Sequence, residues 1–226
     1  METSKGLNTL VRERRSVRAY LSRPVDKQTI LQILDLARQT ASGGNMQPWQ
    51  VHVLHSETIA KLHHEISDEV EKNGFGSDGD YQYYPTASVE PYDERIKQSG
   101  LDLYSSLSIG PRDTARKRQQ KLRNFEFYGA PVGLLITMDR KLAQGSWIDI
   151  GLFLNMLTLA ISDAGLACCT QASFSSYGDI IRRTLKLSSD SLIICGVALG
   201  YEDKTDPINA LPRRRKALED FVEFHP

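Results

Sequence analysis

Two arginine clusters stand far apart in the sequence, and each places cationic side chains at alternate positions. The first is Arg14-Arg15-Ser16-Val17-Arg18 and the second is Arg213-Arg214-Arg215. In an extended segment alternate side chains face the same way, so residues 14, 16 and 18 would present a guanidinium, a hydroxyl and another guanidinium. Guanidinium groups bind phosphate through paired N–H donors. The spacing therefore predicts a phosphate site, with a solvated basic turn or a basic tail as the alternative interpretation.

A polar turn supplies a second set of groups suited to ligand binding. The segment Ser42-Gly43-Gly44-Asn45-Met46-Gln47-Pro48-Trp49 joins a helical pattern to a strand pattern. Its glycines let the backbone approach a ligand closely, and Asn45 and Gln47 bring amide groups. A plain connection between a helix and a strand needs fewer hydrogen-bonding side chains. We expect a binding loop here, and a capped loop is the alternative.

The sequence lacks the signatures of hydrolases and of metal sites. It contains no Gly-x-Ser-x-Gly elbow and no Walker loop. His63 and His64 are adjacent, so on a helix they point in different directions and cannot share one metal ion. Cys168, Cys169 and Cys195 have no metal-ligand spacing and form no disulfide framework. We therefore predict no bound metal, no catalytic nucleophile, and a reducing, cytoplasmic location.

Composition and charge narrow the function further. The chain has 226 residues, of which 40% are hydrophobic and 25% charged, which is typical of a globular protein of one domain. Lys plus Arg and Asp plus Glu number 28 each, so net charge favours neither nucleic acid nor an anionic membrane as partner. A formal Gly-x-Gly-x-x-Gly run at residues 74–79 follows a helical pattern where a dinucleotide site needs a strand, so we interpret it as a loop.

Hydrophobic periodicity predicts the elements that position these motifs. We expect helices over residues 4–14, after Asp26 up to the polar turn, over 57–72 and over 147–166, and strands over 17–21, 51–54, 132–138 and 192–199. The helix at 147–166 is interrupted by polar residues and is predicted to be buried in the protein rather than to span a membrane. Residues 73–115 hold five tyrosines among Gly, Pro and Ser, and we interpret them as a lid-like insertion. The irregular order of elements favours an α+β fold around one sheet.

Four segments in this order resemble the FMN-dependent nitroreductase superfamily: Arg-Arg-Ser-x-Arg, Ser-Gly-Gly-Asn-x-Gln-Pro-Trp, Gly-Ala-Pro-Val-Gly before a strand, and a late Leu-Pro-x-x-Arg. In length and character the insertion resembles that of nitrobenzoate-type nitroreductases more than that of the compact enteric enzymes. The resemblance implies one domain over residues 1–226, with a nitroreductase-like α+β fold and a central, mostly antiparallel sheet flanked by helices. It also implies an entwined homodimer with one FMN in each of two interface sites.

The resemblance assigns FMN-binding roles by position. Arg14 and Ser16 match phosphate ligands, and Arg18 matches the cation near the flavin pyrimidine edge. The polar turn matches a segment that reaches the cofactor largely from the partner subunit, and the backbone N–H of Ala172 or Ser173 matches the donor that faces flavin N5. The implied FMN-binding residues are Arg14, Arg15, Ser16, Arg18, Ser42, Gly43, Asn45, Gln47, Asn124, Gln171, Ala172, Ser173, Arg213 and Arg215.

The resemblance further implies hydride transfer from NAD(P)H through flavin N5 to a nitroaromatic compound or a quinone, by a ping-pong mechanism. FMN carries the hydride in such a scheme, so no catalytic side chain is required. We expect Tyr92, Arg95 and Arg112 of the insertion to contact the substrate, and an insertion that only packs on the surface is the alternative. Two other functions remain open: a reductive dehalogenase that resembles iodotyrosine deiodinase, and a non-catalytic FMN-binding or storage protein.

Overall fold

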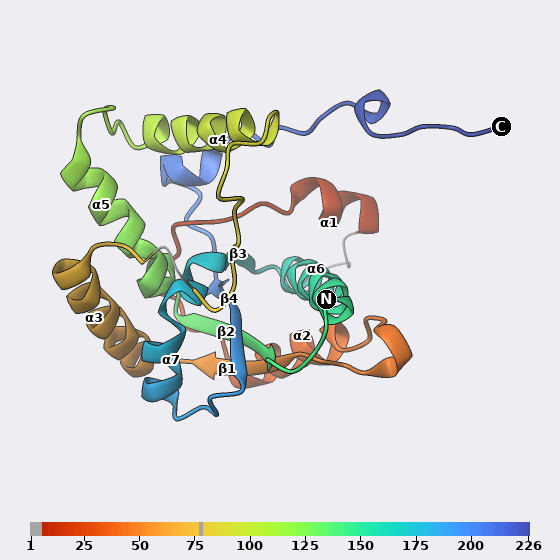
Figure 1. Cartoon of the computed structure of the whole chain (residues 1–226), viewed down its shortest axis with the longest axis horizontal. Coiled ribbons are helices and arrows are strands. Elements are labelled where there is room, and N and C mark those ends of the chain that lie inside the picture. The colour runs from red at the N-terminus through yellow and green to blue at the C-terminus, as the bar shows by residue number, and fades with distance from the viewer. Residues whose placement is uncertain (1–5, 77–78) are drawn as a thin grey trace.

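The computed structural model of the chain describes residues 6–76 and 79–226, which form a sheet between two layers of helices (Figure 1). The strand order is β1-β2-β4-β3, and every neighbouring pair is antiparallel. The strands are β1 (Gln50–Leu54), β2 (Val132–Asp139), β3 (Ala167–Gln171) and β4 (Ser191–Gly200). The predicted α+β class with an antiparallel central sheet is confirmed.

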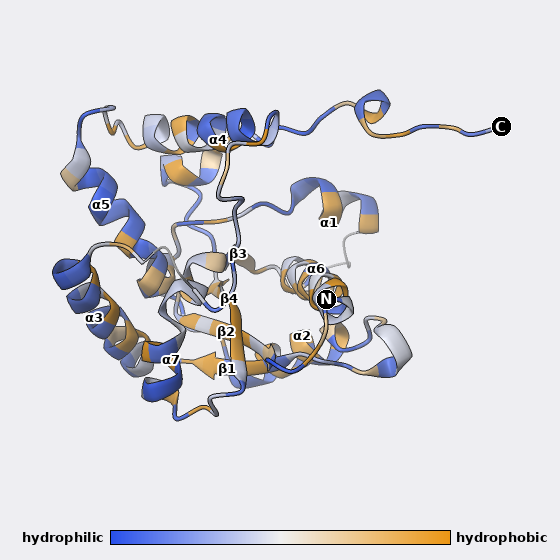
Figure 2. Ribbon diagram, viewed as in Figure 1, coloured by the Kyte–Doolittle hydropathy of each residue, from blue (hydrophilic) through white to orange (hydrophobic). Residues whose placement is uncertain are grey.

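The two central strands, β2 and β4, are buried on both faces. In β2 the side chains of Leu134 and Ile136 enter one hydrophobic cluster, and Leu135 between them enters the other. A strand that is covered on both sides carries apolar residues at successive positions. This explains why residues 132–138 and 192–199 form continuous apolar runs, which Figure 2 shows in orange at the centre of the molecule.

Helices cover the sheet from both sides. One side is covered by α2 (Lys27–Ala37) and α6 (Gly145–Asp163), and the other by α3 (Ser56–Asn73) and α7 (Gly178–Leu185). Helix α2 begins where the sequence predicts, because the carboxylate of Asp26 accepts a hydrogen bond from the backbone N–H of Thr29 at 2.9 Å. A side-chain acceptor at this position satisfies an N–H that has no partner within the helix.

Helix α6 has two apolar sides with different surroundings. It is long and apolar enough to cross a membrane by length and composition alone, and 44% of its most apolar window is buried in the structure. One side, which includes Phe153 and Leu157, packs in the core. The opposite side exposes Ile148, Leu152 and Met156, at 70%, 45% and 37% of their full surface. These three residues, the α6 stripe, lie four positions apart and form one line on the helix.

The segments near the arginine clusters and in the insertion depart from the predicted elements. Helix α1 covers Leu7–Glu13, and the part of the predicted range before residue 6 lies outside the described residues. Residues 17–21 form no strand, so that prediction is wrong. This segment makes only two isolated bridges, from Ser16 to Cys168 and from Tyr20 to Glu202. It does not continue as a strand, because the backbone N–H of Arg18 donates to the side chain of Asn209 and not to a neighbouring strand.

The insertion contains helices that the sequence did not predict. Helix α4 (Tyr92–Ser106) lies across one end of the sheet, and α5 (Thr114–Leu122) begins within the insertion and leads back toward α3 (Figure 1). No residue of α4 is buried, which explains its weak apolar pattern. Beyond residue 211 the chain passes α4 and then extends away from the sheet.

Candidate ligand-binding site

Residues 14–20 form an extended strap that runs beside β3. The backbone N–H of Val17 donates to the carbonyl of Cys168 at 3.0 Å, and the side chains of Val17 and Ala19 are buried at 2% and 5% exposure. Ser16 and Arg18, which alternate with these two buried residues, therefore face the other way, as the alternation in the sequence predicts. They line a pocket together with residues from the opposite end of the chain.

This arginine pocket has a volume of about 540 Å³. Its lining includes Arg14, Arg15, Ser16, Arg18, Arg95, Arg213 and Arg215. Asp102 of α4 is the one carboxylate among the described lining residues, and it is paired with Arg214 at 3.0 Å. Burial and the neighbouring charges of Arg14, Arg215 and Arg15 lower the pKa of Arg213. The pocket thus holds mutually repelling cations, which a bound anion would stabilise.

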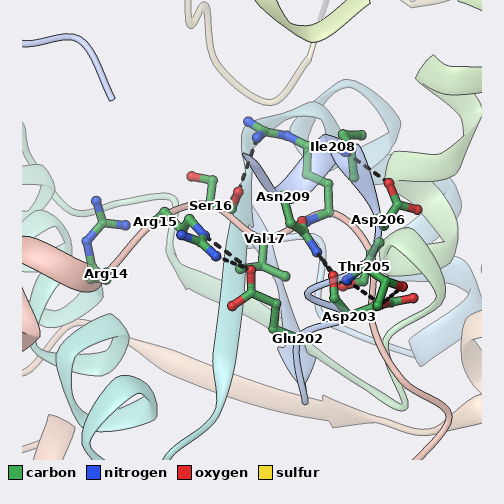
Figure 3. Close-up of polar contacts among 12 residues, drawn as sticks. Arg14, Arg15, Ser16, Val17, Glu202, Asp203, Thr205, Asp206, Ile208 and Asn209 are labelled. Carbon is green, nitrogen blue, oxygen red and sulfur yellow. Dashed lines mark hydrogen bonds and ion pairs between the residues drawn. The ribbon is translucent and has the colours of Figure 1, made fainter. Parts of the chain in front are cut away.

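Two of these arginines have partners that hold the pocket together. The guanidinium of Arg15 points at Glu202, with 2.6 Å between its Nη2 and the Oε1 atom (Figure 3). The guanidinium of Arg213 donates to the backbone carbonyls of Arg12 and, at 2.8 Å, of Arg14, at the end of α1. Cations at this end of a helix satisfy carbonyls that lack partners within it. Arg213 therefore joins the two arginine clusters, and Arg15 fixes the first cluster to the segment that follows β4.

A buried asparagine holds the strap in place. The Oδ1 atom of Asn209 accepts a hydrogen bond from the backbone N–H of Arg18 at 2.8 Å, and its Nδ2 donates to the carbonyls of Ala19 and Asp203 at 2.9 and 2.8 Å. Figure 3 shows this side chain between the strap and the segment that follows β4. Nothing in the sequence distinguishes Asn209 from other polar residues of its proline-rich turn.

A second pocket adjoins the first. It has a volume of about 780 Å³, and Tyr84 lines both. Its lining includes Phe75, Tyr81, Tyr83, Tyr84, Asn124, Phe125, Ala172, Ser173 and Tyr177, and we call it the aromatic pocket. The structure thus brings the predicted residues Asn124, Ala172 and Ser173 to one pocket and the predicted arginines to the next. The pair offers guanidinium groups at one end and flat apolar surfaces with amides at the other.

Residues of η2 (Arg123–Gly129) and η3 (Ala172–Tyr177) meet beside the aromatic pocket. Asn124 accepts a hydrogen bond at Oδ1 from the hydroxyl of Tyr128 at 2.7 Å, and its backbone carbonyl accepts one from Nε2 of Gln171 at 2.6 Å. Gln171 is 3% exposed, and its Oε1 atom has no hydrogen-bond partner. Gln171 therefore lies beneath the pocket and supports Asn124.

An acidic residue that the sequence analysis did not single out fixes the tyrosine segment. The carboxylate of Asp80 accepts hydrogen bonds from Arg182 at 2.5 and 2.9 Å, from Arg140 at 3.1 Å and from the backbone N–H of Ile193 at 2.7 Å. Burial alone would raise the pKa of Asp80, but these hydrogen bonds outweigh it and lower the pKa below its usual value. The adjacent Tyr81 donates its hydroxyl to the carbonyl of Ile194 at 2.8 Å.

The polar turn lies elsewhere in the chain. It includes η1 (Gly43–Asn45) and packs on α6, where the backbone N–H of Gly43 donates to Asp149 at 3.0 Å. Residues 43–47 are exposed, Ser42 is half-buried, and none of them lines either pocket. Within one chain, therefore, the predicted ligand groups of the turn do not meet the arginines.

The predicted substrate residues are also divided. Arg95 lines the arginine pocket, and its guanidinium lies 5.7 Å from the ring centre of Tyr92. Tyr92 and Arg112 are exposed and line neither of the two pockets.

Across residues 6–76 and 79–226, no group of three or more His, Cys, Asp or Glu side chains is arranged to hold a metal ion.

Comparisons with known proteins agree on one group. Residues 11–201 match the Nitroreductase family. The chain is 35% identical to the 4-nitrobenzoate reductase of Pseudomonas putida, over 96% of this chain and 94% of that protein, and 33% identical to the nitrobenzene nitroreductase of Ectopseudomonas oleovorans, over 99% of each. It also resembles the crystal structure of the FMN and NADPH-dependent nitroreductase NfnB from Sphigopyxis sp. strain HMH. That likeness has a TM-score of 0.94 and 32% identity, and covers 98% of this chain and all of the other.

Proposed function

Because this chain belongs to the nitroreductase family, we propose that it is an FMN-dependent oxidoreductase that uses NAD(P)H to reduce nitroaromatic compounds. The observation that carries this proposal is the pairing of a cationic pocket with an aromatic one at Tyr84. FMN has the same polarity along its length, with a phosphate at one end and a flat ring with a polar edge at the other.

The donor set of the two pockets fits FMN. The arginine pocket supplies charge-assisted N–H donors for a phosphate. The aromatic pocket supplies apolar surfaces for a flat ring and the amide of Asn124 for its polar edge. The unpartnered Oε1 atom of Gln171 is a further polar group next to Asn124. No catalytic carboxylate or histidine is needed, because FMN when bound supplies the hydride chemistry.

We assign the roles of the binding residues accordingly. Arg14, Ser16 and Arg215 hold the phosphate, with Arg213 and Arg15 supporting them through their contacts to α1 and Glu202. We assign Arg18, which lines the arginine pocket, to the polar edge of the ring, where its fixed positive charge would stabilise negative charge on the ring. The backbone N–H groups at Ala172 and Ser173 bind the ring from β3's side of the aromatic pocket.

Two features support the proposal that the enzyme is an entwined homodimer. The α6 stripe is apolar and exposed, and so are Leu218, Phe221 and Phe224 in the segment that extends away from the sheet. A second copy of the chain would cover these surfaces, and burying them would stabilise the pair. The same arrangement would let the polar turn of one subunit reach the FMN of the other, which its position on α6 does not allow within one chain.

We further propose that the described insertion, through Arg95 and Tyr92 on α4, selects electron-poor aromatic substrates. We also propose that the enzyme has one domain and is cytoplasmic. Arg95 lines the arginine pocket and is exposed, so its guanidinium is available to pair with a substrate carboxylate. Arg112, which lies outside both pockets, would contact the substrate only if the segment between α4 and α5 moved.

An anaerobic visible spectrum of the purified protein, taken before and after addition of NADH or NADPH, tests the proposal. We expect bound oxidised flavin that either nucleotide bleaches, and recovery of the colour when 4-nitrobenzoate or nitrobenzene is added. A flavin that neither nucleotide reduces would contradict the reductase and favour an FMN-binding protein without this activity. A colourless protein that FMN does not reconstitute would contradict the cofactor assignment itself.

A further inference from the structure

We infer that Tyr128 is a positioning residue that links Arg18 of the arginine pocket to Asn124 of the aromatic pocket and fixes both toward the ring of FMN. The inference rests on the proposed function, in which these two residues lie at the polar edge of that ring. Tyr128 itself lines neither pocket and is 5% exposed. It therefore acts through its neighbours.

The hydroxyl of Tyr128 has a defined donor direction. It donates to Oδ1 of Asn124 at 2.7 Å, and Tyr128 lies within the electrostatic influence of the positive charge of Arg18. The hydroxyl hydrogen is committed to Asn124, so the phenol oxygen is the atom left to face a positive charge. Burial raises the pKa of Tyr128, which keeps the phenol protonated and able to donate. Tyr128 thus interacts with the charge of Arg18 and is hydrogen-bonded to the amide of Asn124.

The hydrogen bond from Tyr128 determines how Asn124 presents its amide. Because Oδ1 is occupied by Tyr128, the Nδ2 group is the end left for other partners, and one of its two hydrogens is used by the carbonyl of Lys121 at 3.0 Å. The second hydrogen remains as a donor toward the aromatic pocket that Asn124 lines. The positive charge of Arg18 polarises the hydrogen bond from Tyr128 to Asn124 and so strengthens this donor.

The backbone of η2 is shaped to hold the phenol in this place. Phe127 and Tyr128 both have left-handed φ angles, of 51° and 56°, which bulky side chains rarely adopt. The ring of Phe127 fits because β2 and β4 carry glycine beneath it. A Cβ atom at Gly133 would lie 2.7 Å from that ring, and one at Gly196 would lie 3.0 Å from it. Such conformations persist where their surroundings force them, and they concentrate at functional sites.

Tyr128→Phe tests the inference, because it removes one hydroxyl and keeps the ring. We expect a urea midpoint close to that of the unchanged protein, with FMN binding to the apo-protein weakened roughly 10-fold, which is the scale of one charge-assisted hydrogen bond. The reduction potential of bound FMN should become more negative, because the reduced, anionic ring depends more on Arg18 and Asn124 than the oxidised ring does. A purely structural role would alter stability and leave the potential unchanged.

Two further variants make the result decisive. Tyr20→Phe is the matched control, since it removes the hydroxyl that donates to the carbonyl of Val17 at 2.8 Å in the same region, and we expect it to leave the potential unchanged. Asn124→Asp keeps the acceptor for Tyr128 and removes the amide donor, so it should weaken FMN binding even if Tyr128→Phe does not fold. Unaltered affinity and potential in Tyr128→Phe, or unaltered affinity in Asn124→Asp, would overturn the inference. Failure of the unchanged protein to bind FMN would instead overturn the proposed function.

Discussion

The side chain of Asn209 is bonded to the backbone N–H of Arg18 across 191 residues of sequence. It also bonds to the carbonyls of Ala19 and Asp203, and it is 2% exposed. One amide thereby saturates three backbone groups and ties the strap that carries Arg14 and Arg18 to the segment that carries Arg213 and Arg215. These hydrogen bonds of Asn209 therefore help to determine the shape of the arginine pocket.

Replacing Asn209 with alanine should destabilise the protein. The substitution leaves the backbone N–H of Arg18 and the carbonyl of Asp203 without this partner, while the carbonyl of Ala19 keeps a bond from the N–H of Asp203 at 3.1 Å. We expect the free energy of unfolding to fall by about 2–3 kcal/mol. Urea denaturation of the apo-protein measures this directly. Asn73→Ala, which removes an exposed hydrogen bond to Glu69 on α3, is the control and should change the value by less than about 0.5 kcal/mol. Equal, small effects of both substitutions would contradict the role of Asn209.

Removing two arginines from the pocket should release the cofactor. In the double variant Arg14→Ala with Arg215→Ala, two charge-assisted contacts to phosphate are lost, each worth roughly 1.5–3 kcal/mol, so FMN affinity should fall by about two to four orders of magnitude. The flavin content of the purified protein and titration of the apo-protein measure the loss. Arg38→Ala on α2, where the arginine pairs with Asp35 on the surface, should retain full occupancy. A double variant that stays fully loaded would disprove the phosphate site.

Asp80 should make stability depend on pH in the acid range. Its hydrogen bonds lower its pKa in the folded state, so its contribution is complete above the ordinary carboxyl pKa of about 3.9 and is lost as the pH falls through the lowered value. Asp80→Asn should therefore be less stable than the unchanged protein near pH 7, by about 3 kcal/mol for a disrupted buried ion pair. The difference should shrink below about pH 4.

Urea midpoints of both proteins from pH 3 to pH 7 check this expectation. The same substitution should loosen the segment that carries Tyr81 and Tyr84, because Asp80 connects it to β4 through Ile193. Limited proteolysis within the insertion reports that loosening. A stability difference that stays constant over the whole pH range would show that the carboxylate charge is not the cause.

Charged side chains on the α6 stripe should separate the proposed dimer. Ile148→Lys with Leu152→Glu places charges on a surface that one chain leaves exposed, so each chain should still fold while the pair is lost. Light scattering after size-exclusion chromatography should give the mass of one chain, close to 25.4 kDa, against twice that for the unchanged protein. Lys72→Glu on α3 is the control. A double variant that remains dimeric would place the interface elsewhere.

The sequence predicted long helices that bury one face and long strands that are buried on both faces. Helices α2 and α3 have regular apolar faces, and the central strands have continuous apolar runs. The short strand β3 was missed because its five residues, Ala167–Gln171, include two cysteines and two polar residues and show no alternation. Helix α4 was missed because it buries no residue and so carries no apolar face.

The same physical limit applies to the site. Alternating arginines indicate a pocket because alternation is a local property of an extended chain. The roles of Asn209, Asp80 and Tyr128 depend on contacts with distant segments. Asp80 lies 102 residues from Arg182, and the whole insertion, with helices α2 and α3, lies between Arg18 of the strap and Tyr128. Single residues of these types occur throughout the sequence, so only the folded structure separates them from their neighbours.

The arginine pocket is built from residues near both ends of the chain, so it is completed late in synthesis. The side chain of Arg213 donates a hydrogen bond to the carbonyl of Arg14, which is synthesised 199 positions earlier. A ribosome that adds roughly 5–20 residues per second takes about 10–40 seconds to cover that distance. Throughout this interval the strap and its cations have emerged while Asn209 and Arg213 do not yet exist. Because β4 ends at Gly200, a nascent chain completes the strands of its sheet before it completes the arginine pocket. With the phosphate of FMN in this pocket, as we propose, cofactor loading becomes a step that follows synthesis of the sheet.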